Sequence, residues 1–293
     1  MTRSSVAALL VTAALVVHGC GGAGDPGGDA ATGPTPPSAE RPGAVDGVVA
    51  VDGGDLHVRC VGSGDATVVL IAGFGDGGEN WGTVEPPLAR SARVCSYARF
   101  GTGASDPAPA PQTHESHART LRTLLRSIGE AGPFALVGHS LGGAEAVVFA
   151  SLFRSEVSGL MLIDASPANW IAAGCSVPDD GTEAARGFAG MCRSLTDPAL
   201  NPERLDGRAA SEGVAAVTSL GRLPMTVLTT TERPFPGIDP RQQARLDRVW
   251  NRGQEHWASL SPISRLVRVP GAGHYIHVDR PAVVVAELRR LTG

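Results

Sequence analysis

The stretch GHSLG, residues 138–142, places Ser140 between two apolar runs. The first run predicts a buried strand and the second a helix, so the serine would stand on a sharp turn between them. This G-x-S-x-G pattern is typical of a nucleophilic serine on such a turn. Gly138 and Gly142 would remove the Cβ atoms that collide there. A serine that only caps the helix fits the same letters, but the strand-turn-helix context favours the nucleophile.

A serine hydroxyl is a weak nucleophile near neutral pH and needs a base beside it. His274 is the best candidate, because it follows the last predicted strand on the Gly-rich loop of VPGAGHYIHVDRP, residues 269–281. We expect His139, beside the serine, to support the turn. His277 is expected either to be solvated or to support the site from behind. Ser140 and His274 together predict acyl transfer through the serine.

Charge and cysteine spacing argue against several other classes of protein. The formal net charge is −4, and all 25 basic residues are Arg, scattered along the chain. Without a basic block or interleaved aromatic residues, we expect no binding to nucleic acid. No pair of cysteines has the C-x-x-C spacing of a zinc site, so we expect no metal. We also expect no cofactor, because side chains alone can supply the nucleophile, the base and the acidic residue that orients the base.

The N-terminal residues have the features of an export signal. Arg3 is followed by an apolar stretch from Val6 to Val17, which falls short of the roughly 20 residues that span a bilayer but suits a signal peptide. Residues 1–19 are therefore predicted to be a signal peptide. The sequence VVHGC, which ends at Cys20, resembles a bacterial lipobox. We expect lipidation of Cys20 to hold the protein at the cell envelope; without lipidation, the protein would be secreted.

A tether and one large domain are predicted after the signal. Residues 20–46 are rich in Gly, Pro, Ala and Asp and have almost no large apolar side chains. Such a segment buries too little surface to offset the entropy lost on ordering, so it is predicted to be disordered. Residues 47–293 are enough for a single domain with a sizeable core.

Short apolar segments alternate with helical ones along that domain. Eight segments are predicted to be strands: 47–51, 55–62, 66–74, 92–100, 133–140, 157–166, 223–230 and 263–274. The alternation breaks at residues 167–222, which mix Gly, Pro and Asp with short helical pieces and are predicted to form a lid. The pattern predicts an α/β fold with a mostly parallel sheet covered by helices on both faces.

Five motifs occur in order: LIAGFG (70–75), YARFGTGASD (97–106), GHSLGG (138–143), LMLIDAS (160–166) and VPGAGHYIHVDRP (269–281). Together they resemble the α/β-hydrolase-fold serine hydrolases of the esterase and lipase type, over essentially all of residues 47–293. The resemblance implies an eight-stranded, mostly parallel sheet with a small lid after the sixth strand. It also implies an oxyanion hole made by the backbone N–H groups of Phe74 and Leu141. Many relatives have His-Gly where this chain has Ala72-Gly73.

Two carboxylates compete for the place of the triad acid. In many such hydrolases an Asp follows the seventh strand, but here that segment reads TVLTTTERPFPG and offers only Glu232. Asp164 stands at the end of the sixth strand, where some relatives place their acid. An Asp is also frequent there without any role in the triad. We favour Asp164 as the acid that orients His274, with Glu232 as the alternative.

The four cysteines that follow Cys20 are expected to form disulfides, because their number is even and the chain is predicted to be exported. Sequence alone allows three pairings. In the usual strand order of the resembled fold, the second and fourth strands are neighbours, which favours a Cys60–Cys95 bridge. Cys175 and Cys192 would then staple the lid.

The expected function is the hydrolysis of small-molecule carboxylic esters through an acyl-serine intermediate. Haloalkane dehalogenases and epoxide hydrolases of this fold use an aspartate nucleophile, so Ser140 argues against those reactions. An amidase or aminopeptidase, or a cofactor-free perhydrolase, would use the same triad and stays an alternative. A non-catalytic binding lipoprotein is disfavoured, because both Ser140 and His274 are present. Contact with a membrane is expected only through Cys20.

Overall fold

The computed structural model describes residues 43–176, 181–233, 235 and 237–293. The predicted signal peptide, Cys20 and most of the predicted tether lie outside these residues. The first strand begins at Val45, so the folded domain starts two residues before its predicted start at residue 47. None of the helices in the described ranges is long and apolar enough to cross a membrane.

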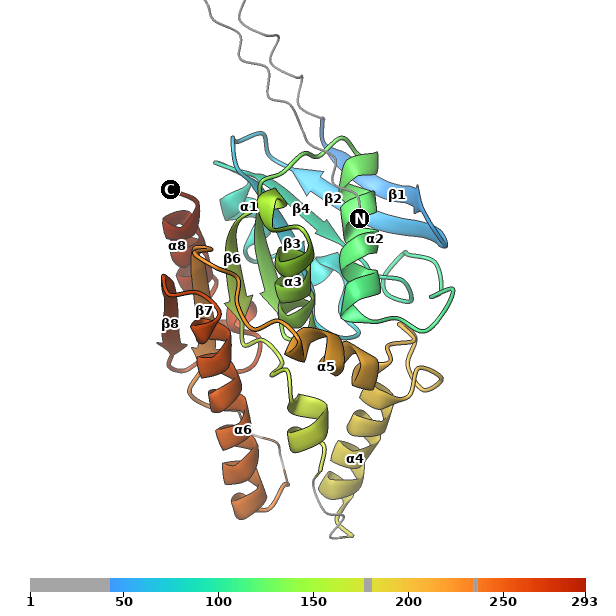
Figure 1. Cartoon of the computed structure of the whole chain (residues 1–293), viewed down its shortest axis with the longest axis vertical. Coiled ribbons are helices and arrows are strands. Elements are labelled where there is room, and N and C mark those ends of the chain that lie inside the picture. The colour runs from blue at the N-terminus through green and yellow to red at the C-terminus, as the bar shows by residue number, and fades with distance from the viewer. Residues whose placement is uncertain (1–42, 177–180, 234, 236) are drawn as a thin grey trace, which may run out of the picture. The chain divides into compact units, whose positions relative to one another are not determined.

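All eight predicted strands are present. They are β1 Val45–Val51, β2 Gly54–Val61, β3 Thr67–Ile71, β4 Arg93–Tyr97, β5 Phe134–His139, β6 Val157–Ile163, β7 Met225–Thr230 and β8 Ser264–Val269. They form one sheet in the order β1-β2-β4-β3-β5-β6-β7-β8 (Figure 1). Strand β2 is antiparallel to both its neighbours, and all the other pairs are parallel. The mostly parallel sheet predicted from the sequence is therefore confirmed.

Helices cover both faces of this sheet. One core contains α2 (His114–Ser127), α3 (Leu141–Leu152) and the end of α6 (Pro240–Ser259); the other contains α1 (Glu85–Leu88), α7 (Ile276–Asp279) and α8 (Pro281–Thr292). Every residue of β4 and β5 is buried, as expected for strands packed on both faces. Strand β1 alternates between half-buried and exposed residues, because it lies at the edge of the sheet.

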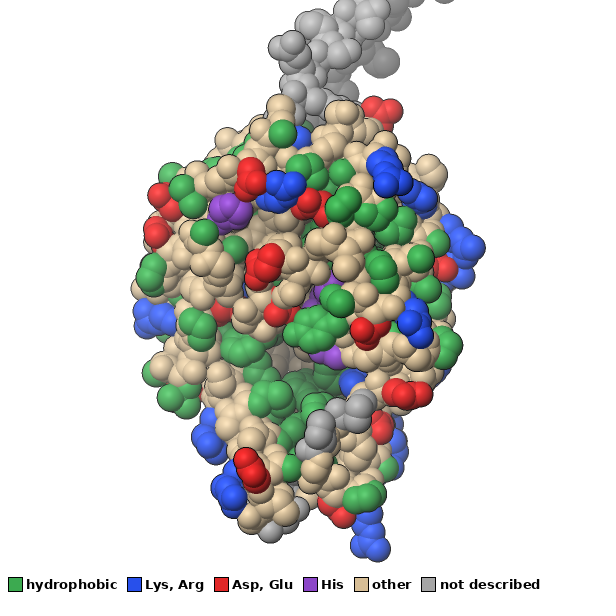
Figure 2. Space-filling model, turned by 180° about the vertical axis from the view of Figure 1, so that it is seen from behind, with side chains coloured by type: hydrophobic (Ala, Val, Ile, Leu, Met, Phe, Trp, Pro, Cys, Tyr) green, Lys and Arg blue, Asp and Glu red, His purple; other side chains and the backbone are tan. Residues whose placement is uncertain are grey.

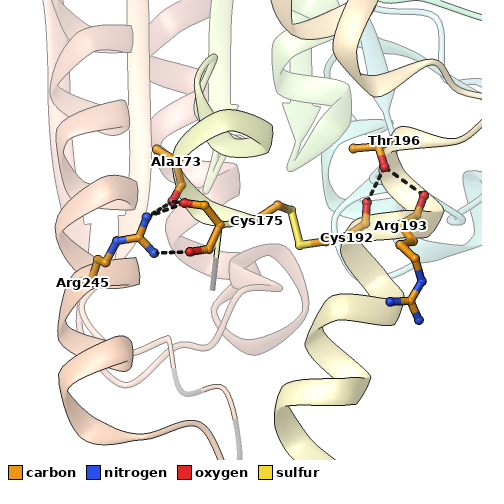
Figure 3. Close-up of a disulfide and its surroundings, with 7 residues drawn as sticks. Ala173, Cys175, Cys192, Arg193, Thr196 and Arg245 are labelled. Carbon is orange, nitrogen blue, oxygen red and sulfur yellow. Dashed lines mark hydrogen bonds between the residues drawn. A yellow bond between two sulfur atoms is a disulfide. The ribbon is translucent and has the colours of Figure 1, made fainter. Parts of the chain in front are cut away.

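An insertion separates β6 from β7, at the place where the lid was predicted. It contains a π-helical turn (Trp170–Gly174) and helices α4 (Glu183–Thr196) and α5 (Gly207–Ala215). A disulfide between Cys175 and Cys192 joins the turn to α4 (Figure 3). Arg245 of α6 donates a hydrogen bond to the Ala173 carbonyl at 2.7 Å, which fastens the turn to α6 as well.

A second disulfide joins Cys60 and Cys95. These residues face each other in register on the neighbouring strands β2 and β4. The Cys60–Cys95 disulfide is therefore the one that the strand order of the resembled fold implied, and Cys175–Cys192 is the pair expected to staple the lid.

Candidate active site

Ser140 lies on a strained turn between β5 and α3. Its backbone has φ 51° and ψ −118°, a conformation that a residue other than glycine keeps only when its surroundings enforce it. The Ser140 N–H donates to the Ile163 carbonyl at 3.1 Å. A Cβ at Gly138 would lie 2.3 Å from the Gly142 carbonyl oxygen, and a Cβ at Gly142 would lie 2.3 Å from that of Ile71. The turn therefore requires both glycines.

His274 lies on the loop between β8 and α7 and is half-buried beside a cavity. Its Nδ1 is 2.7 Å from Asp164 Oδ2. Because the carboxylate can only accept, the proton of the neutral ring lies on Nδ1, and Nε2 keeps its lone pair. His139 Nε2 donates to the backbone carbonyl of His274 at 3.1 Å, and so fixes the loop that carries the ring.

The hydroxyl of Ser140 lies at the same cavity. Its Oγ is 3.3 Å from Ser166 Oγ, which is the hydrogen bond that this side chain makes among the described residues. Ser140, Ser166 and His274 all line the cavity. Either hydroxyl can be the donor in the bond between Ser140 and Ser166.

Asp164 follows β6 and is fully buried. Its Oδ2 accepts from His274 Nδ1 and, at 2.9 Å, from Arg233 Nε. Its Oδ1 accepts from Thr229 Oγ1 at 2.8 Å, Trp250 Nε1 at 3.0 Å and Arg233 Nη2 at 3.1 Å. Burial raises the pKa of Asp164, but the hydrogen bonds from His274 and Arg233 outweigh it and lower this pKa to about 2. Asp164 is therefore ionised at neutral pH.

The structure brings Asp164, and not Glu232, to His274. Glu232 is exposed, and its backbone N–H donates to Thr230 Oγ1 at 3.0 Å. The charged side chain that the loop after β7 turns inward is the next one, Arg233, which is buried. Arg233 was not among the site residues expected from the sequence. Its position directly after Glu232, in the loop that was searched for the acid, could have drawn attention to it. The sequence alone, however, does not show which of two adjacent residues in a loop points inward.

Trp250 of α6 is the second site residue that was not expected from the sequence. Besides its bond to Asp164, its ring meets the His274 ring edge to face, with centroids 5.4 Å apart and planes at 81°. The Arg233 guanidinium lies over the Trp250 ring, 5.0 Å from its centroid. Trp250 therefore packs against both groups that bind Asp164 Oδ2.

Two further histidine rings pack behind His274. His277 lies 4.5 Å from Trp81 and 4.6 Å from His139, measured between ring centroids. Burial, together with the nearby His274, lowers the pKa of His277 to about 4 and that of His139 well below its ordinary range. Of the two roles expected for His277, the solvated one is wrong, because the side chain is fully buried.

The cavity beside Ser140 has a volume of about 430 Å³. Figure 2 shows a hollow on one face of the molecule, with hydrophobic and histidine side chains around it. The insertion and α6 supply much of the apolar lining: Pro167, Trp170, Ile171, Met191, Leu195, Leu205, Ala210, Val214 and Trp250. Such a lining favours an uncharged, apolar group of a ligand.

Two residues that line the cavity have backbone N–H groups without an acceptor in the described part of the chain. The side chains of Phe74 and Leu141 line the cavity, and neither residue's N–H has an acceptor among the described residues. Leu141 is the first residue of α3, so its N–H is one of those left unpaired at a helix start. The partial positive charge at that helix end also favours an anion.

The structure offers no free metal site in the ranges it describes. The single group of side chains there with ligand spacing is Cys60, Cys95 and Glu130. The two sulfurs of this group are bonded to each other, so they are not available as thiolate ligands.

The sequence and the fold of this chain are similar to those of several known proteins. A family model described as "Alpha/beta hydrolase family" matches residues 68–288. The protein YqjL of Bacillus subtilis is 24% identical over 241 residues, which cover 80% of this chain and 87% of YqjL. Lipase LipV of Mycobacterium tuberculosis is 36% identical over 111 residues, 38% of this chain and 41% of LipV. The solved structure of carboxylesterase CesB from Bacillus subtilis has a TM-score of 0.59 and 17% identity, covering 85% of this chain and 91% of CesB.

Proposed function

Since the chain belongs to the alpha/beta hydrolase family, we propose that it hydrolyses carboxylic esters through an acyl-serine intermediate. The observation that carries this proposal is the hydrogen bond of 2.7 Å between His274 Nδ1 and Asp164 Oδ2, at a cavity that Ser140 shares. It supports a triad of Ser140 as nucleophile, His274 as base and Asp164 as acid. The likeness to a lipase and to a carboxylesterase agrees with ester chemistry.

In the first half-reaction, Ser140 Oγ attacks the ester carbonyl carbon while His274 Nε2 takes the hydroxyl proton. The carbonyl oxygen becomes an oxyanion that accepts from the N–H groups of Phe74 and Leu141. His274 then gives its proton to the leaving alcohol, and an acyl-serine remains. Asp164 holds the ring in the tautomer that this step requires and stabilises the imidazolium.

In the second half-reaction, His274 activates a water molecule, which attacks the acyl carbon and releases the carboxylic acid. Ser140 recovers its proton from the imidazolium. The volume of the cavity and its apolar lining support a small or medium acyl group as the substrate's acid part. The nearby Arg233 is engaged with Asp164 and is not needed to bind such a group.

We also propose that the protein is exported and held at the cell envelope by lipidated Cys20. Two disulfides in the folded domain support an oxidising compartment. Mass spectrometry of the mature protein from membranes tests this: a diacylated Cys20 at the N-terminus is expected, and an intact residue 1–19 segment would contradict it.

Labelling with a fluorophosphonate tests the proposed nucleophile. The protein is expected to take up one label at Ser140 and to hydrolyse nitrophenyl esters, with a preference among acyl chains from acetyl to palmitoyl that reports the cavity. Ser140→Ala should abolish both labelling and turnover. Ser166→Ala is the matched control, because this serine lies 3.3 Å away at the same cavity and should leave the label in place. Labelling that survives in Ser140→Ala would refute the assignment.

A further inference from the structure

A buried ion pair joins the insertion to the loop that carries Phe74. Glu203 lies between α4 and α5 and is fully buried, and Arg99, just after β4, is 3% exposed. Arg99 Nε donates to Glu203 Oε2 at 2.7 Å, and Arg99 Nη2 donates to Glu203 Oε1 at 3.3 Å. Burial alone would lower the pKa of Arg99, but Glu203 and the nearby Glu145 carboxylate raise it. Arg99 is therefore a charged group inside the core.

This pair holds the backbone on both sides of the proposed oxyanion donor. Arg99 Nη1 donates to the Ala72 carbonyl at 2.8 Å, and Nη2 donates to the Gly73 carbonyl. Glu203 Oε1 accepts from the N–H of Gly75 at 2.5 Å. Two carbonyls before the donor and one N–H after it are thus bound to a single pair of side chains.

The Gly73 carbonyl and the Phe74 N–H belong to the same peptide unit. Because a trans peptide is planar, its C=O and N–H point in opposite directions. A carbonyl anchored on Arg99 within the core therefore aims the Phe74 N–H away from Arg99, and Phe74 is a residue that lines the cavity. A cation bound to the carbonyl also polarises the peptide, which strengthens its N–H as a donor.

The part of the insertion around Glu203 packs tightly against the rest of the domain. A Cβ on Gly101 would lie 2.0 Å from the Pro202 carbonyl oxygen, so the two backbones touch where glycine alone fits. The N–H of Gln112 donates to the Arg204 carbonyl at 2.8 Å. Arg204 has φ 49°, a strained conformation that persists only where the surroundings fix it. This part of the insertion is therefore a fixed support for the loop.

From this geometry we propose that Glu203 and Arg99 are positioning residues for the oxyanion hole. The insertion thereby takes part in stabilising the transition state as well as in lining the cavity. Neither side chain lines the cavity, so their effect passes through the peptide of Gly73 and Phe74. The inference rests on the proposed ester hydrolase function.

Three substitutions test this role. Glu203→Gln removes the charge at nearly the same size, and Glu203→Asp keeps the charge but is one methylene too short to reach both Arg99 and Gly75. Glu212→Gln is the matched control, because this glutamate is exposed on α5 of the same insertion. The measurements are kcat and KM for a nitrophenyl ester, and inhibition by a trifluoromethyl ketone and by the product carboxylic acid.

Both Glu203 variants are expected to lower kcat by about 10- to 100-fold, which is less than the 10²–10³ that loss of a whole donor costs. KM should change by less than about 3-fold. The trifluoromethyl ketone forms an adduct with Ser140 that carries the oxyanion, so its affinity should fall by the same factor as kcat/KM. Binding of the product acid, and all values for Glu212→Gln, should match those of the unsubstituted protein.

A fall in kcat without a parallel fall in ketone affinity would overturn the proposal, as would Glu203 variants as active as Glu212→Gln. If circular dichroism shows that the Glu203 variants do not fold, Arg99→Lys provides the test, because lysine keeps the charge but cannot bind both carbonyls and the carboxylate. Unfolding of this variant too would assign the pair to stability alone. An unsubstituted protein that neither labels with fluorophosphonate nor cleaves esters would instead refute the proposed function itself.

Discussion

Replacing Asp164 by asparagine removes the charge that His274 and Arg233 share. The pKa of Asp164 is lowered from 3.8 to about 2 in the folded protein. A carboxyl whose pKa is lowered by folding stabilises the protein above its unfolded pKa, and this contribution is lost as the pH falls through the folded pKa. The difference corresponds to about 2.4 kcal/mol of unfolding free energy at pH 5 and above.

By the same linkage, Asp164 contributes about 1.3 kcal/mol to the unfolding free energy at pH 3. At that pH, Asp164 is mostly protonated in the unfolded chain but not in the folded protein. We therefore expect Asp164→Asn to destabilise the protein by about 1 kcal/mol less at pH 3 than at pH 5. The variant also leaves the Arg233 cation buried without its carboxylate. That cost is large, but it is equal at both pH values because arginine stays charged.

Urea unfolding at pH 5, 4 and 3, followed by tryptophan fluorescence, measures this difference. Titration of groups common to both proteins cancels when the variant is compared with the unsubstituted protein at each pH. Glu232→Gln controls for the loss of an exposed carboxylate beside Arg233. A destabilisation that stays constant from pH 5 to pH 3 would refute the view that Asp164 is held ionised by its hydrogen bonds.

Two further outcomes follow from the same contacts. Asp164→Asn should lower kcat for ester hydrolysis by about 10⁴-fold, whereas Glu232→Gln should change it by less than about 3-fold; steady-state kinetics of the two variants decides between the acids, and equal losses would reassign the role. Replacing Cys175 and Cys192 together by serine should lower the unfolding free energy by about 3 kcal/mol, because the disulfide spans 17 residues. Urea unfolding with and without reductant measures this, and an unchanged midpoint in the double variant would contradict it.

The sequence predicted well the elements that depend on residues close together in the chain. The turn at Ser140 could be predicted because its glycines are needed for backbone contacts within a few residues of the serine and with the neighbouring strand. The strands could be predicted because continuous apolar runs such as that of β5 reflect burial on both faces. What could not be predicted are contacts between distant side chains. Trp250 reaches Asp164 across 86 residues and Glu203 reaches Arg99 across 104, and no local pattern marks such pairs.

The proposed acid, Asp164, lies at the end of β6, whereas the sequence also offered Glu232 after the neighbouring strand β7. Strands β6 and β7 are parallel neighbours, paired at Ile163 and Leu228, and the Asp164 N–H donates to the Leu228 carbonyl at 2.7 Å. The end of β7 also lies close to the loop that carries His274, because Thr230 Oγ1 donates to the Ala272 carbonyl.

With the proposed acid at the end of β6, the loop after β7 supplies a cation, Arg233. Arg233 and His274 bind the same oxygen of Asp164, so the carboxylate's charge is partly neutralised before any imidazolium forms. We infer that Asp164 contributes more by orienting His274 than by stabilising the imidazolium's charge. In the proposed mechanism, more of the transition-state stabilisation then falls to the oxyanion hole, in which we propose that Glu203 and Arg99 position the peptide that donates to the oxyanion.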